Sequence, residues 1–139
     1  MKKKFFLTLV ASVITCLWLS QEIMAAKGIY IPLFTYRTGP FAGSGIPNAN
    51  GMSDYLNMLN ERDGGIGGVP IIVEECETGY NTKKGVECYE RIKQKNPVVI
   101  NPYSTGITLQ LIPKSPIDKI PVHSMGYGLS AAADGSVFP

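Results

Sequence analysis

The segment YRTGPFAGSG (residues 36–45) is a glycine-rich loop between an apolar run and a helical pattern, an arrangement that can hold a small anion. A phosphate-binding P-loop needs Gly-Lys-Ser/Thr where the helix begins, and the sequence has no such triplet. The dinucleotide fingerprint G-x-G-x-x-G is absent too, because Gly39, Gly43 and Gly45 are spaced differently. Pro47, at the expected start of the helix, has no amide hydrogen to donate. The segment therefore does not predict a phosphate site.

Side chains that could act as nucleophiles or bases are present, but their sequence context does not favour catalysis. Ser44, Ser104 and Ser124 all lack the G-x-S-x-G sequence of a nucleophile elbow. His123 lies in an apolar run, where we expect a structural or pocket-lining side chain. As the only histidine, it also leaves too few ligands for a zinc site, so we expect no metal and no cofactor.

Three carboxylates, Glu74, Glu75 and Glu77, cluster at the end of an apolar, strand-like run. Neighbouring residues of a strand point to opposite faces, so Glu74 and Glu75 cannot flank one bond as an acid and base pair. We expect solvated charges at the end of a strand, and no enzyme.

A neutral group of hydroxyl and aromatic residues follows another apolar run, in NPYSTGIT (residues 101–108). Ser104 and Thr105 stand at the expected start of a helix, where free amides and the positive helix end favour a carboxylate. Hydroxyls can donate to that carboxylate, and exposed carbonyls can accept from an ammonium. Tyr103 and Tyr127 could form walls around an apolar or aromatic side chain. The pattern predicts reversible binding of a small zwitterion or amide, with ordinary loop residues as the alternative.

The first 26 residues have the order of a secretory signal peptide. Three lysines (residues 2–4) precede an apolar stretch from Phe5 to Leu19, and the small residues Ala25 and Ala26 follow. The apolar stretch is shorter than the roughly 20 residues of a membrane span. We expect cleavage after Ala25 or Ala26 and a periplasmic protein, with an uncleaved membrane anchor as the alternative.

Export has two consequences for the mature chain. The signal peptide, with three lysines and one glutamate, carries the whole net charge of +2, so the mature part is nearly neutral and offers no basic surface for nucleic acid. Two cysteines, Cys76 and Cys88, then lie in an oxidising compartment, which predicts a disulfide, with two free thiols as the alternative.

The 139 residues are enough for one domain with a core. Strand-like and helical patterns alternate along the mature chain, which predicts an α/β fold with a parallel sheet covered by helices on both faces. In such sheets ligands bind at the carboxyl ends of the strands, so we expect the loops 36–47, 102–107 and 125–130 to border a site. The expected strands are 27–35, 69–75, 97–101 and 120–125, and the expected helices are 48–65, about 82–95, and a short one that Pro113 ends.

Several motifs, in this order along the chain, resemble the periplasmic substrate-binding proteins of branched-chain amino-acid ABC transporters, the type I periplasmic binding proteins. The resemblance covers essentially the whole of residues 27–139 and implies the N-terminal lobe of a two-lobe protein, truncated before its second lobe. In that family a hinge joins two α/β lobes that clamp the ligand between them. The motifs are TGPFAGSG, GGIGG, CETGYNTKKGVECYERIK, NPYSTGIT and KIPVHSMGYG.

The resemblance also implies ligand contacts. Ser104 and Thr105 occupy the family's hydroxyl positions for the ligand α-carboxylate. Gly126, Tyr127 and Gly128 fall in the loop that holds the ammonium and carboxylate groups. Because Gly128 replaces a threonine of the family, either the head group is held differently or the ligand is not an α-amino acid.

Ser44 stands where the family often packs an aromatic residue on the ligand side chain, and Tyr36 or Tyr103 could compensate. The implied function is capture of a small amino acid, branched-chain or otherwise apolar, and delivery to permease subunits in the membrane. An amide or urea-like solute, or a ligand-sensing domain, is the alternative, and a soluble α/β enzyme with its site at the same sheet edge is less favoured.

Overall fold

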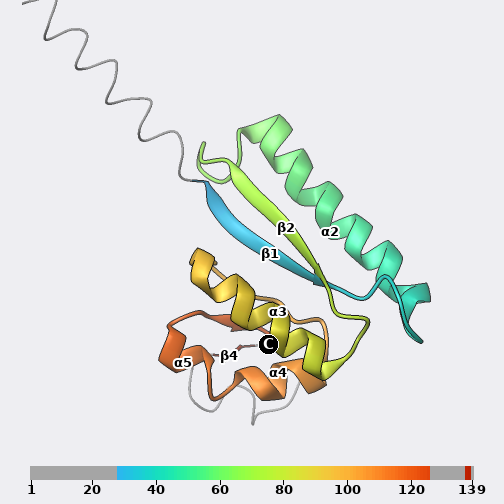
Figure 1. The fold of residues 1–139 in the computed structure, drawn as a ribbon. Coiled ribbons are helices and arrows are strands. Elements are labelled where there is room, and N and C mark those ends of the chain that lie inside the picture. Colours follow the sequence, from blue (N-terminus) through green and yellow to red (C-terminus); the bar gives the residue numbers. More distant parts are fainter. Residues whose placement is uncertain (1–27, 126–136, 139) are drawn as a thin grey trace, which may run out of the picture.

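The computed structural model describes residues 28–125 and 137–138 (Figure 1). The predicted signal peptide (residues 1–26) and three of the predicted ligand contacts, Gly126, Tyr127 and Gly128, lie outside the described residues.

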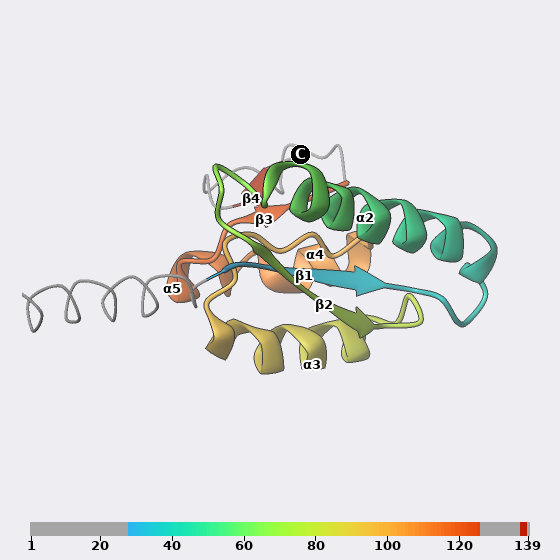
Figure 2. The same cartoon turned by 90° about the horizontal axis from the view of Figure 1, so that it is seen from above.

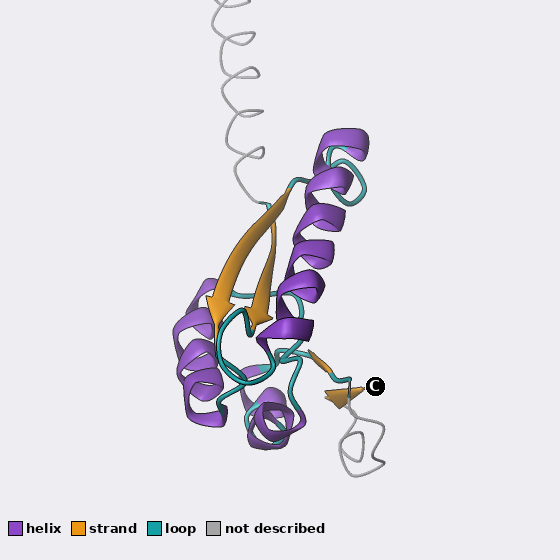
Figure 3. Cartoon of the chain, turned by 90° about the vertical axis from the view of Figure 1, so that its right-hand side faces the viewer, coloured by secondary structure: helices purple, strands orange, loops and turns teal. Residues whose placement is uncertain are grey.

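The two long strands, β1 (Ile29–Thr35) and β2 (Ile71–Glu77), pair in parallel along their full length. Most of β1 is buried, as expected of a strand that is covered on both faces. Figure 3 shows the two strands running side by side in the same direction, with the chain returning through helices. The predicted parallel arrangement is confirmed for this pair.

The sheet continues on the other side of β1. Parallel bridges join Leu33 to Asn101 and Ile100 to Val122, and β3 (Val122–His123) pairs in parallel with β4 (Val137–Phe138). The predicted strand 97–101 is therefore reduced to two bridging residues. Pro97 and Pro102 flank those residues and have no N–H to donate to a neighbouring strand.

Helices cover both faces of the sheet, as predicted. The helix α2 (Ala42–Asp63) packs on β1 and β2 from one side, and α3 (Thr82–Ile92) packs from the other (Figure 2). The helix α4 (Thr105–Leu111) packs against α3. A 3₁₀ turn, Lys93–Lys95, extends α3, and a short helix α5, Ser115–Asp118, precedes β3.

The start of α2 was predicted wrongly. The helix begins at Ala42, so that Gly43 and Gly45 are helical rather than part of the loop, and Pro47 lies inside the helix. The amides that close the first turn, those of Ser44 and Gly45, donate to the carbonyl of Phe41 and precede the proline. The turn therefore forms without the hydrogen bond that Pro47 cannot make.

The helix α3 agrees with its predicted pattern. The Asn81 side chain caps it by accepting from the Lys84 amide at 3.0 Å, and Tyr89 and Ile92 are fully buried, whereas Val86 is half-buried. This face meets the sheet and α4 in one core, whose other fully buried members are Phe34, Ile100, Ile107, Leu111, Val122 and Val137. Among the described residues, no helix has the length and apolar character needed to cross a membrane.

Candidate ligand-binding site

A cavity of about 260 Å³ lies where the chain leaves the carboxyl ends of the strands. The order of the sheet reverses at β1, because β2 lies on one side of it and Asn101 on the other. Ligands of parallel α/β sheets bind at such reversal points, where the loops diverge. The lining residues come from four loops, from α2 and from the first residue of α4; they are Tyr36, Asn48, Tyr80, Tyr103, Ser104, Thr105 and Met125.

Ser104 and Thr105, both predicted, line this cavity at the start of α4. Ser104 is buried, and its hydroxyl accepts from the Ile107 amide at 3.4 Å, which caps the helix. A hydroxyl can accept and donate at the same time, so this capping role is compatible with donation to a ligand. Thr105 is exposed.

Tyr103 and Tyr36, also predicted, line the same cavity. Tyr103 has a left-handed backbone with φ of 50°, which few residues other than glycine adopt, and its amide donates to Asn101 Oδ1 at 3.3 Å. Burial and, to a lesser degree, the neighbouring Tyr36 raise the pKa of the Tyr103 hydroxyl above its ordinary value. Tyr103 is therefore neutral at physiological pH and can donate a hydrogen bond.

Tyr80, which was not predicted, adds a third tyrosine to the cavity. Its ring stands edge-on to Tyr36, with centroids 5.1 Å apart, and packs at a tilt against Phe41 at 4.6 Å. Tyr80 lies three residues after the end of β2, so the rule that ligands bind after parallel strands would have indicated it. Asn48 was missed for another reason, because the helix was expected to begin only there.

Ser44 does not join the other predicted residues. It is exposed in the first turn of α2, where its hydroxyl donates to the carbonyl of Phe41 at 3.1 Å, and it does not line the cavity. Tyr36 and Tyr103, the two residues that were expected to compensate for Ser44, do line the cavity.

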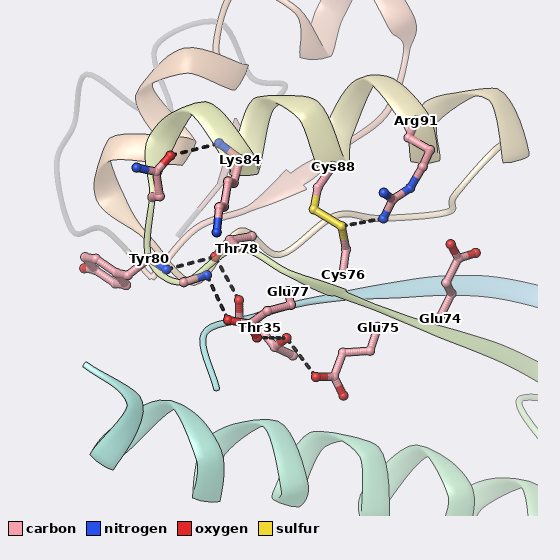
Figure 4. The surroundings of a disulfide bond; sticks show 12 residues. Thr35, Glu74, Glu75, Cys76, Glu77, Thr78, Tyr80, Lys84, Cys88 and Arg91 are labelled. Atoms are coloured by element: carbon pink, nitrogen blue, oxygen red, sulfur yellow. Dashed lines mark hydrogen bonds between the residues drawn. A yellow bond between two sulfur atoms is a disulfide. The ribbon is translucent and has the colours of Figure 1, made fainter. Parts of the chain in front are cut away.

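The carboxylate of Glu77 joins the loops that carry Tyr36 and Tyr80. Figure 4 shows it beside Thr35 and the segment that leads to Tyr80. One oxygen accepts from the Arg37 amide at 2.8 Å and lies 3.1 Å from the Thr35 hydroxyl. The other accepts from the Thr38 hydroxyl at 2.9 Å, the Thr38 amide at 3.2 Å and the Gly79 amide at 2.9 Å. Glu77 therefore fixes the ends of β1 and β2 relative to each other.

Glu75 and Glu77 are exposed and Glu74 is half-buried, as expected of charges at a strand end, but all three also have specific partners that were not predicted. Glu75 forms an ion pair with Arg37 at 2.5 Å, and Glu74 accepts from Lys95 and from the Tyr30 hydroxyl. These different partners do agree with the prediction that Glu74 and Glu75 point to opposite faces. The sequence could not identify the partners, because each lies 21 or more positions away.

The hydrogen bonds of Glu77 give the loops a dependence on pH. Burial alone would raise the pKa of Glu77, but the bonds from the Arg37 amide, Thr38 and Thr35 outweigh it and lower this pKa. A carboxylate with a lowered pKa in the folded state stabilises that state above its unfolded pKa. The contribution disappears as the pH falls through the folded-state value.

Glu77→Gln is expected to lower the free energy of unfolding by about 1–2 kcal/mol near pH 7, because an amide nitrogen then faces backbone donors. Urea unfolding should show the whole difference in the free energy of unfolding at pH values above the ordinary glutamate pKa of about 4.3. The difference should vanish at lower pH, where the Glu77 carboxyl is protonated. Glu61→Gln, an exposed residue of α2, is the matched control and should change stability by less than about 0.5 kcal/mol. Equal losses in the two variants would contradict the role of Glu77.

The predicted disulfide is present. Cys76 at the end of β2 and Cys88 in α3 are bonded, with Cα atoms 6.1 Å apart, and both are buried (Figure 4). Arg91 Nη2 lies 2.8 Å from the Cys76 sulfur. The bond ties α3 to the residue that directly precedes Glu77.

His123 lines a second, mostly apolar cavity of about 300 Å³ between β1 and α2, with Tyr55 and Met52 among its other walls. Its Nδ1 atom is 2.9 Å from the side-chain amide of Asn101, so its predicted role as a structural, pocket-lining residue is confirmed. Within residues 28–125 and 137–138, no cluster of three or more His, Cys, Asp or Glu side chains could hold a metal ion.

Comparison with known proteins places this geometry in context. A model of the periplasmic binding protein family matches residues 28–139. No curated protein matches the chain. A structure described as an ABC transporter permease from the Pseudomonas fluorescens group is 41% identical, with a TM-score of 0.68, over 73% of this chain and 25% of that one.

Two further solved structures are more distant and show the fold alone. The branched-chain amino acid transporter substrate-binding protein LivJ of Streptococcus pneumoniae, in complex with isoleucine, is 21% identical with a TM-score of 0.68, over 81% of this chain and 33% of that one. A solute-binding protein of R. palustris in complex with benzoate is 18% identical with a TM-score of 0.62, over 81% and 32%. The chain thus spans a quarter to a third of the length of these structures.

Proposed function

Because the chain belongs to the periplasmic binding protein family, we propose that it is the N-terminal lobe of an exported solute-binding protein that serves an ABC importer. The family is one of substrate-binding proteins, which agrees with the prediction that the chain is not an enzyme. One observation carries the proposal further: the described lining of the cavity at the carboxyl edge of the sheet consists of hydroxyl, amide and aromatic side chains and one methionine, none of them charged.

The ligand we propose is a small amino acid with a branched or otherwise apolar side chain. Thr105 and Ser104 would donate to its carboxylate, and Tyr36 and Tyr103 would enclose its side chain. A second lobe would supply the remaining contacts, and closure of the two lobes about a hinge would present the loaded protein to permease subunits. An amide or urea-like solute fits the same uncharged lining and is the second candidate.

The test is a binding measurement on the full-length exported protein with leucine, isoleucine, valine, acetamide and urea. A ligand at a concentration of 100 times its Kd should stabilise the protein by about 2.7 kcal/mol. Thr105→Val is expected to weaken binding about tenfold, which corresponds to one lost hydrogen bond to a charged group. Thr82→Val, at the first position of α3 and outside the cavity, is the matched control.

Other outcomes would replace the proposal. Binding without any loss of solute uptake in cells that lack the protein would favour a sensing domain over delivery. Conversion of a bound solute that depends on Ser104 or His123 would favour an enzyme. Equal affinities of the Thr105→Val and Thr82→Val variants would remove Thr105 from the site.

A further inference from the structure

We propose that the ligand of this site carries a planar aromatic ring joined to a carboxylate, as in an aromatic acid or an aromatic amino acid. This inference rests on the proposed role as a solute-binding protein, and it replaces the branched-chain amino acid proposed there by a solute with an aromatic ring. It is carried by the composition of the cavity wall and by the way in which that wall is held in place.

The wall is aromatic rather than aliphatic. Three tyrosines, Tyr36, Tyr80 and Tyr103, reach the cavity from the loops that follow β1, β2 and the Asn101 bridge. Among the described lining residues, none is valine, leucine or isoleucine, and Met125 is the one aliphatic side chain. Two aromatic rings in offset or edge-on contact gain free energy beyond the area that they bury, and methionine sulfur also packs well on a ring.

The aromatic wall is set before any ligand arrives. Tyr80 is supported by edge-on contact with Tyr36 and by Phe41. Tyr80 and Tyr103 both hold left-handed backbones, with φ of 60° and 50°, which fix the direction in which each side chain leaves the main chain. The Glu77 carboxylate joins the loops of Tyr36 and Tyr80. Rings that are already ordered lose little conformational freedom on binding, which favours a rigid, flat ligand.

Size and charge agree with this class. The cavity of about 260 Å³ is just below the roughly 300–1,000 Å³ of pockets for drug-sized ligands, which suits a single ring. Because none of the seven lining residues is charged, the ligand's carboxylate would be held by neutral donors such as Thr105. The described wall contains no carboxylate to pair with an ammonium, so an acid without an amino group fits as well as an amino acid.

The experiment compares benzoate, 4-hydroxybenzoate and phenylalanine with leucine and valine on the full-length protein by calorimetry. At least one aromatic ligand should bind ten times more tightly than leucine. Comparing phenylalanine with benzoate distinguishes an aromatic amino acid from an aromatic acid, because benzoate has no ammonium group. Tyr80→Leu should weaken aromatic binding about tenfold and leucine binding by a clearly smaller factor, so that the preference for the aromatic ligand falls, whereas Tyr80→Phe should keep that preference within twofold. Tyr55→Leu, an exposed tyrosine of α2 outside this cavity, is the control.

The outcomes separate this inference from the proposed function. Tighter binding of leucine or valine than of every aromatic ligand would overturn the inference and support the proposed function. A Tyr80→Leu variant that loses aromatic and aliphatic ligands equally would also overturn it, because the ring would then have a structural role alone. Failure of every small solute to bind would overturn both.

Discussion

Replacing Cys76 and Cys88 together by alanine is expected to lower the free energy of unfolding by about 3 kcal/mol. The disulfide closes a loop across 12 positions and so restricts the unfolded chain. It also joins β2 to α3 inside the core, where both cysteines are buried. Urea unfolding of the exported protein, followed by far-UV circular dichroism, measures the effect.

The reduced wild-type protein is the control for this double variant. Reductant should destabilise the wild type by a similar amount and should leave the Cys76→Ala/Cys88→Ala variant unchanged. Because Cys76 directly precedes Glu77, the variant should also bind its ligand more weakly as the loop of Tyr80 loosens. Unfolding of the variant and the oxidised wild type at the same urea concentration would show that the bond does not constrain the chain.

The elements with strong local patterns could be predicted from the sequence. Apolar runs identified β1 and β2, and a three-residue step with an asparagine cap identified α3. The same reasoning placed four residues at the carboxyl edge of the sheet: Tyr36, Tyr103, Ser104 and Thr105. All four line the cavity at that edge. In a parallel sheet, the positions of loops follow from the order of strands and helices, which is a local signal.

Contacts between distant segments could not be predicted in this way. Four of the five groups that donate to Glu77 lie about 40 positions away, and nothing in ETGY indicates them. The early start of α2 depends on how closely its first turn approaches the chain after β1. Proline and two glycines there argued against a helix, and tertiary packing outweighed those propensities.

Gly45→Ala is expected to lower the free energy of unfolding by about 3 kcal/mol, at the upper end of the cost of overpacking. Gly45 is buried in the first turns of α2, and a Cβ atom there would overlap the carbonyl oxygen and the ring of Tyr36. Because the carbonyl belongs to the backbone just after β1, it cannot rotate away as a flexible side chain would. Either α2 or the loop that carries Tyr36 has to shift.

Gly43→Ala, two positions earlier in the same helix, is the matched control. A Cβ atom at Gly43 meets nothing within 4 Å, so this variant should gain up to about 0.5–1 kcal/mol from the better helix propensity of alanine. Calorimetry should then show weaker ligand binding for Gly45→Ala alone, since Tyr36 lines the cavity. If both variants unfold and bind alike, α2 does not hold Tyr36 in place. If only Gly45→Ala loses both stability and affinity, the glycine positions the aromatic wall through helix packing rather than through a flexible loop.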